Sequence, residues 1–211
     1  MNQFPPEFRD QLNNLMRWRR DVRHFHADKP VSDELLAQVL DAIRLAPSVG
    51  LSEPWRIVAL KSDTARAKAL ANFENANAEA LNGYSGGRAK VYAGLKLSGM
   101  RDAPVQLAVF CDDGTDKGAG LGAGTMPEAR RYSVVSAIMN FWLAARAHGL
   151  GVGWVSIIDP VKLATDLDVP NEWALVAYLC VGWPVEASLT PELEKVEWEK
   201  RDALLASVLE R

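Results

Sequence analysis

The sequence of 211 residues has few of the residues that mark several large classes of protein. It contains two cysteines and three histidines, so it has no disulfide framework of the kind seen in small secreted domains. Cys111 and Cys180 each lie inside an apolar run, which predicts two buried free thiols. Neither cysteine lies near His24 or His26 at the spacing of a metal site, so we expect no bound metal.

Other features are missing as well. The net charge is −3, which argues against nucleic acid as the main partner, because such domains are usually basic across a whole face. The first residues lack the basic and apolar blocks of a signal peptide, and no apolar run has the length of a membrane span. No Gly-x-Ser-x-Gly segment marks a hydrolase nucleophile. We therefore expect a soluble, cytoplasmic protein that contacts neither nucleic acid nor membrane.

What the sequence does contain is an alternation of helix and strand signals, with 48% hydrophobic residues to form a core. Helical spacing, caps and stops predict four main helices, over residues 6–18, 33–45, 63–81 and 127–148. Short apolar runs predict four strands, over residues 55–60, 105–111, 151–158 and 173–181. Such an alternation predicts an α/β or α+β fold around one sheet, in a single domain over residues 1–211.

The helix predicted over residues 127–148 is apolar around nearly its whole circumference. Such a helix is either buried on all sides or lies in a subunit interface. The chain becomes polar after Pro184 and loses clear periodicity. We therefore expect a polar C-terminal extension.

Two segments are rich in glycine. Residues 82–99 contain five glycines among tyrosines and basic residues, which is typical either of a partly helical lid or of an ordinary surface excursion. Residues 118–123 can be aligned with the dinucleotide fingerprint G-x-G-x-x-A. That fingerprint must follow directly on a strand, and the polar residues 112–117 intervene, so a flexible loop is the prediction here.

Positive charge gathers near the N-terminus, where residues 17–23 contain four arginines around Asp21. The planar guanidinium donates paired hydrogen bonds and stays charged, which suits a phosphate ligand. The alternative is a solvated helix end with one internal ion pair.

Several motifs in a fixed order resemble the nitroreductase-like flavoprotein superfamily, over Arg17 to about Arg201. These motifs are residues 19–23, residues 46–50 followed by Pro54 and Trp55, the long apolar helix predicted over residues 127–148, and residues 149–153. Ordinary nitroreductases usually have serine at the position of Asp21. This difference, together with residues 95–97 and 151–157, resembles the branch that makes 5,6-dimethylbenzimidazole, the lower ligand of cobalamin.

The resemblance implies an α+β fold with a central, mostly antiparallel sheet flanked by helices. It also implies a homodimer with the long helix at the interface, FMN between the two subunits, and a lid at about residues 82–99 over the isoalloxazine. Arg19 and Arg23 would hold the phosphate and ribityl end of FMN, with Arg20 and Val22 alongside. Arg201 resembles the family's late basic residue at the same phosphate.

Three further contacts to FMN are implied. Ser48 would hydrogen-bond the flavin or the ribityl chain, and Lys96 and Leu97 would contact it from the lid. Glu53 stands where the family commonly has glutamine. An ionised carboxylate can only accept hydrogen bonds, so a donor role of this side chain toward the flavin is in question.

The branch that makes dimethylbenzimidazole consumes reduced FMN with O2, and the ribityl chain yields erythrose 4-phosphate. A flavin reductase in trans supplies the reduced flavin, and no metal is implied. Asp21 is the only acid in the arginine cluster; its neighbours should keep it ionised, as a proton acceptor. Ser156, at the end of its strand, is its expected partner in proton transfer.

Two other functions remain open at this point. The first is an NAD(P)H-dependent nitro- or quinone reductase on the same fold, against which Asp21 argues. The second is a non-catalytic FMN-binding module in which Asp21 is only an ion-pair partner.

Overall fold

The structure, a computed structural model, describes residues 3–95, 98–202 and 211. Its helices are α1 (Pro6–Trp18), α2 (Asp33–Asp41), α3 (Asp63–Asn82), α4 (Gly86–Gly94), α5 (Gly99–Asp102), α6 (Ala129–Ala147), α7 (Pro160–Asp166) and α8 (Glu192–Lys195), with short 3-10 helices η1 (Ala42–Leu45) and η2 (Val49–Leu51). Its strands are β1 (Trp55–Ala59), β2 (Val105–Asp112), β3 (Gly151–Val155) and β4 (Trp173–Gly182).

The four strands form one sheet in the order β1-β2-β4-β3, and every neighbouring pair is antiparallel. The predicted α+β fold with an antiparallel sheet is therefore confirmed. One predicted strand is too long, because the residues after Val155 leave the sheet. Val155 is the last residue paired with β4, and Asp159 is held instead by Asn72, whose side-chain Oδ1 accepts from the Asp159 backbone N–H at 2.8 Å.

Local capping explains where several helices begin. Ser32 Oγ accepts a hydrogen bond from the Leu35 N–H at 3.2 Å, and Ser62 Oγ accepts one from the Ala65 N–H at the same distance. Each bond satisfies one of the free N–H groups in a first helical turn. These local signals place α2 and α3 where the sequence predicts them.

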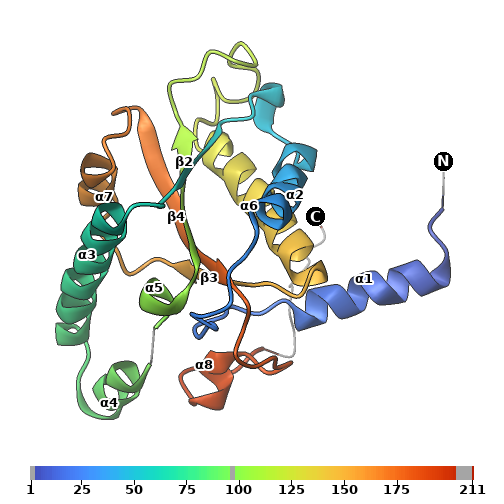
Figure 1. Ribbon diagram of the computed structural model, residues 1–211. Coiled ribbons are helices and arrows are strands. Elements are labelled where there is room, and N and C mark those ends of the chain that lie inside the picture. The colour runs from blue at the N-terminus through green and yellow to red at the C-terminus, as the bar shows by residue number, and fades with distance from the viewer. Residues whose placement is uncertain (1–2, 96–97, 203–210) are drawn as a thin grey trace.

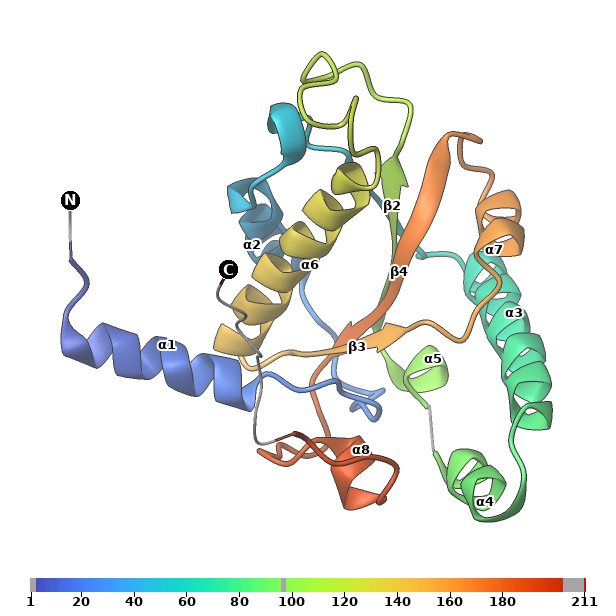
Figure 2. The ribbon, with the colours of Figure 1, turned by 180° about the vertical axis from the view of Figure 1, so that it is seen from behind.

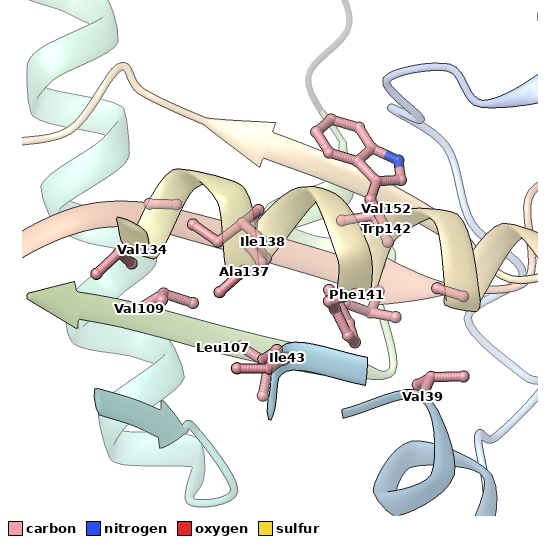
Figure 3. Packing of buried hydrophobic residues seen from close by; sticks show 14 of the residues in the cluster. Val39, Ile43, Leu107, Val109, Val134, Ala137, Ile138, Phe141, Trp142 and Val152 are labelled. Carbon is pink, nitrogen blue, oxygen red and sulfur yellow. The ribbon is translucent and has the colours of Figure 1, made fainter. Parts of the chain in front are cut away.

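The sheet separates two hydrophobic clusters, with α2 and α6 on one face and α3 and α7 on the other (Figures 1 and 2). Strand β2 contributes Leu107 and Val109 to the first cluster, and Ala108 and Phe110 to the second. Successive side chains of a strand point to opposite faces, so one apolar run supplies both clusters. Figure 3 shows Phe141 and its neighbours on α6 pointing into the first cluster.

Helix α6 is not buried on all sides. Phe141 is fully buried, but Tyr132, Val135 and Met139 are 55%, 41% and 39% exposed. These three residues recur at helical spacing and form one apolar face that the described residues leave exposed. Burial all round is therefore wrong for the single chain, and the interface alternative is the one that remains.

Helix α1 extends away from the body of the molecule (Figures 1 and 2) and has no buried residue. Phe4, just before it, and Phe8, Leu12 and Met16 within it are exposed at intervals of four residues. They form a second exposed apolar stripe, on a helix whose C-terminal end approaches α6, where Trp18 lies near Arg146. None of the described helices is long and apolar enough to cross a bilayer.

Candidate active site

Residues 17–23, called here the arginine segment, run past the edge strand β3. The Val22 N–H donates to the Val152 carbonyl at 3.0 Å, and Asp21 and Val152 form an isolated parallel bridge. The Trp154 N–H donates to Asp21 Oδ1 at 2.8 Å. The sheet edge thus fixes both the backbone and the carboxylate of the segment.

Two glycines of β3 make this close approach possible. A Cβ at Gly153 would overlap the carbonyl oxygen of Val22, and a Cβ at Gly151 would lie 2.8 Å from the Val22 side chain. A real Cβ does not approach a backbone oxygen so closely. The glycines of the Gly-Val-Gly run are therefore required for contact with Val22, a reason that the sequence motif alone does not reveal.

Asp21 and Ser156 line the same cavity, of about 140 Å3, together with Arg23, Met100 and Cys180. Ser156 lies one residue beyond the end of β3 and is exposed to this cavity. No other described residue forms a hydrogen bond with its hydroxyl group. Two residues that are 135 positions apart in the sequence thus face one space, and their partnership in proton transfer stays a prediction.

The pKa of Asp21 is raised, mainly because burial among neighbouring groups penalises the charged carboxylate. The hydrogen bond from Trp154 and the charges of Arg23 and Arg19 act in the opposite direction but are outweighed. The expectation that the neighbouring arginines have the largest effect on the pKa of Asp21 is therefore wrong. The side chain is 43% exposed, and this exposed part faces the cavity, so a proton can be exchanged there.

Arg23 is the buried member of the arginine cluster, with a side chain that is 13% exposed. Its Nε lies 3.6 Å from Asp21 Oδ2 and has no hydrogen-bond partner among the described residues. A buried donor without a partner is costly. Arg23 therefore presents a donor that an acceptor in the cavity would satisfy.

A second cavity, of about 370 Å3, is basic. It is lined by Arg17, Arg19, Arg20 and Arg201, with Asn13 and Met16. The pKa values of Arg19 and Arg20 are both lowered, chiefly by burial and also by the charge of Arg201. The chain thus gathers four cations from both of its ends, which favours an anion site over a solvated helix end.

Two of these arginines are held in place by their neighbours. The Arg19 guanidinium lies 4.8 Å from the ring centroid of Trp142, which itself packs near Trp154. The Arg20 Nε donates to the Leu189 carbonyl at 2.8 Å. Fixed side chains lose less conformational freedom when a ligand binds. The two tryptophans were not among the predicted site residues, although cation–π contacts favour tryptophan.

Ser48 does not join this site within one chain. The neighbouring Val49 N–H donates to Ser133 Oγ at 3.0 Å, near the start of α6, whereas Arg19 lies over Trp142 near its other end. Trp142 lies nine positions after Ser133, which corresponds to about 13 Å of helix. Ser48 Oγ accepts from the Glu53 N–H at 3.1 Å.

Glu53 has a partner of its own, because its carboxylate forms an ion pair with Lys117. The loop that carries Lys117 packs Gly118 against the backbone of Gly50, and the next helix, α6, begins only at Ala129. Residues 118–123 thus form turns and not the start of a helix, so the predicted loop is present, packed against Gly50. Lys96 and Leu97 lie outside the described residues.

The floor of the cavity that contains Asp21 includes two sulfur-containing residues that sequence reasoning did not select. Met100 Sδ and Cys180 Sγ lie 4.0 Å apart, and both side chains are buried. Burial raises the pKa of the Cys180 thiol to about 12, as it does for Cys111. Both cysteines are thus buried and free, as predicted, and both stay neutral. No group of three potential metal ligands occurs among the described residues.

Known proteins match nearly the whole chain. Residues 16–183 match the nitroreductase family. A protein of Rhodospirillum rubrum named 5,6-dimethylbenzimidazole synthase is 55% identical, over 94% of this chain and 93% of that protein. A protein of Rhodobacter capsulatus with the same name is 43% identical, over 93% of this chain and 95% of that protein.

Solved structures share the fold at low sequence identity. An iodotyrosine deiodinase bound to FMN and 3-iodo-L-tyrosine superposes with a TM-score of 0.74 at 20% identity, over 95% of this chain and all of that one. A BluB-like flavoprotein of Clostridium difficile superposes with a TM-score of 0.67 at 21% identity, over 94% of this chain and 99% of that one. The chain therefore belongs to the nitroreductase family and, within it, to the group of 5,6-dimethylbenzimidazole synthases.

Proposed function

We propose that this protein uses O2 to fragment reduced FMN into 5,6-dimethylbenzimidazole and erythrose 4-phosphate. The observation that carries this proposal is the meeting of Asp21 and Ser156 in one cavity, while Arg19 and Arg20, which directly precede Asp21 in the chain, line the four-arginine cavity. The 55% identity to a protein named for this product supports it. FMN acts here as a substrate, with O2 as the second substrate, and we propose that no metal takes part.

The basic cavity is the proposed site of the FMN phosphate. The charge of Arg201 contributes to lowering the pKa values of both Arg19 and Arg20, so the three side chains lie close together. A phosphate dianion would relieve this repulsion and accept paired hydrogen bonds. Arg23, whose Nε has no hydrogen-bond partner among the described residues, would donate to the ribityl end, next to the Val22 backbone.

The rest of the site is proposed to come from a second copy of the chain. Ser48 is too distant to reach the arginine segment of its own chain. The exposed apolar face of α6, which includes Val135 and Met139, provides a surface for a homodimer. In such a dimer FMN would lie at the interface, with Ser48 of one chain facing the arginines of the other. A large apolar face is typical of obligate dimers.

Asp21 and Ser156 are the proposed catalytic residues. A carboxyl whose pKa is raised by burial can both release and regain a proton nearer to neutral pH, which suits general acid–base work. The Ser156 hydroxyl, which has no hydrogen-bond partner among the described residues, can donate to or accept from the ring system in the cavity. Residues 82–99, with Lys96 and Leu97, would act as a lid that excludes water, within one domain over residues 1–211.

The flavin must arrive in its reduced form. We propose that a separate, cytoplasmic flavin reductase supplies it. The rival function is an NAD(P)H-dependent nitro- or quinone reductase, to which relatives such as a putative nitroreductase of Bacillus subtilis, 24% identical, correspond by name. A non-catalytic FMN-binding module is the third alternative.

One experiment separates these three functions. The purified protein is mixed in air with chemically reduced FMN, and the products are separated by chromatography. In a parallel sample, NAD(P)H replaces the chemical reductant. Benzimidazole formation in the first sample supports the proposal. Rapid flavin reduction by NAD(P)H without loss of flavin would support the reductase, and stable FMN in both samples would support the binding module.

A further inference from the structure

The C-terminal segment of residues 189–201, called here the strap, touches the proposed phosphate site at both of its ends. Near its start, the Leu189 carbonyl accepts the hydrogen bond from Arg20 Nε at 2.8 Å. At its end, Arg201 lines the basic cavity with Arg19 and Arg20. The strap is therefore part of the wall that surrounds the cavity.

Between these two ends, the strap touches the lid. The Trp198 ring meets Tyr84 edge-on, with ring centroids 5.3 Å apart, and lies 6.3 Å from Tyr92 of α4. The Arg88 guanidinium of α4 lies 5.2 Å from the same ring. Figure 2 shows α8 and α4 at the same end of the molecule. Trp198 is thus the point where the strap holds the lid helix.

The two contacts are mechanically linked. The Trp198 N–H donates to the Leu193 carbonyl at 2.9 Å, and the Arg201 N–H donates to Glu194 Oε1 at 2.8 Å. Both acceptors belong to the single-turn helix α8. Arg201 lies three positions after Trp198, and a chain of that length spans at most about 11 Å. A shift of Arg201 is therefore transmitted to Trp198 through one short, hydrogen-bonded unit.

We propose that Trp198 and Arg201 are positioning residues through which the phosphate of the ligand controls the lid helix α4, so that a phosphorylated flavin is selected for reaction and not only for binding. This inference rests on the proposed function. With the basic cavity empty, the like charges of Arg19, Arg20 and Arg201 repel one another. With a phosphate present, Arg201 is drawn toward it, and Trp198 is held against Tyr84 and Arg88.

The coupling between the phosphate and α4 can be tested by supplying the flavin and the phosphate as two separate molecules. Reduced riboflavin has the ring system of FMN but lacks the phosphate, and inorganic phosphate is the missing part. The wild-type protein is given reduced riboflavin in air, with and without inorganic phosphate, and benzimidazole is measured. We expect phosphate to raise kcat for riboflavin by a factor typical of coupled sites, about 5-fold to 150-fold.

Four variants assign the effect to the strap. Trp198→Ala should abolish activation by phosphate and lower kcat for reduced FMN while its KM changes little, whereas Trp198→Phe, which keeps an aromatic ring, should restore both. Arg201→Ala should abolish activation and also raise KM for FMN. Lys200→Ala is the matched control, because it removes the neighbouring charge but does not line the basic cavity, and it should behave as wild type.

A measurement without turnover completes the test. Hydrogen exchange of residues 84–95 is followed in the wild-type protein with inorganic phosphate alone, and protection should increase. If phosphate neither protects this segment nor activates riboflavin, while reduced FMN still yields benzimidazole, the coupling is refuted and the proposed function stands. If reduced FMN yields no benzimidazole, the proposed function fails, and protection by phosphate still decides whether the strap links the cavity to α4.

Discussion

Replacing Gly153 by alanine tests how the arginine segment is held. The added Cβ would overlap the Val22 carbonyl oxygen, which has no freedom to rotate away as a side chain would. The segment must then move off β3. This movement would stretch two hydrogen bonds, from Val22 N–H to Val152 and from Trp154 N–H to Asp21.

The size of the effect follows from these two bonds. A neutral buried hydrogen bond contributes about 1 kcal/mol and one to a charged group about 1.5–3 kcal/mol, so the docked segment loses about 2.5–4 kcal/mol. If the protein cannot bind FMN while the arginine segment is displaced from β3, the binding free energy weakens by up to the same amount. The apparent affinity for FMN then falls by up to about 10²-fold to 10³-fold. Isothermal titration with oxidised FMN measures the affinity, and thermal unfolding confirms that the variant is folded.

Gly151→Ala provides the matched control, because its Cβ would meet only the side chain of Val22. Adding Val22→Ala should restore FMN affinity to the Gly151→Ala variant but not to the Gly153→Ala variant, whose obstacle is backbone. Equal rescue of both variants, or unchanged affinity in Gly153→Ala, would refute the reasoning about this contact.

Three further predictions concern other parts of the account. Asp21→Asn should lower benzimidazole formation by at least ~10²-fold while FMN still binds. Burial raises the pKa of Asp21 in the folded protein, so the wild type should lose stability relative to the variant as pH rises from the ordinary aspartate pKa of about 4 toward the raised value. Denaturation at several pH values checks this sign. Met139→Glu should give a monomer with weak FMN binding in sedimentation and titration experiments, but with folded stability changed by about 0.5 kcal/mol or less, because Met139 is 39% exposed in the single chain. Asn72→Ala removes two hydrogen bonds to the Asp159 backbone and should lower the free energy of unfolding, measured in urea, by about 2–4 kcal/mol. It should also slow turnover, because Ser156 lies three residues before Asp159. Unchanged turnover would show that this loop does not affect the chemistry.

Much of the fold follows from local signals in the sequence. Ser32 and Ser62 are caps whose action is complete within four residues, so α2 and α3 begin where the sequence predicts. These caps depend on short-range geometry, which the sequence contains directly. The meeting of Arg201 with Arg17, Arg19 and Arg20 in one cavity is a long-range feature, and it was expected only from the resemblance to the family.

Other features depend on distances that only the folded chain defines. The raised pKa of Asp21 is the balance between burial and three neighbouring groups, and that balance could not be read from the arginines beside it. The role of Gly153 depends on a backbone 131 residues away, and the contact of Trp198 with Tyr84 depends on where the polar extension folds back. An alternating Gly-Val-Gly within an apolar strand was the one available signal, because glycine in a strand often marks a close backbone approach.

The central claim is that this protein consumes its flavin instead of recycling it. The most direct measurement is a single turnover, in which the protein is loaded with reduced FMN without oxygen and then mixed with O2, and both flavin and benzimidazole are quantified. The account predicts that flavin is lost in proportion to the benzimidazole formed, and that the yellow absorbance of oxidised FMN returns only for the unreacted fraction. Complete return of oxidised FMN with no benzimidazole would contradict it.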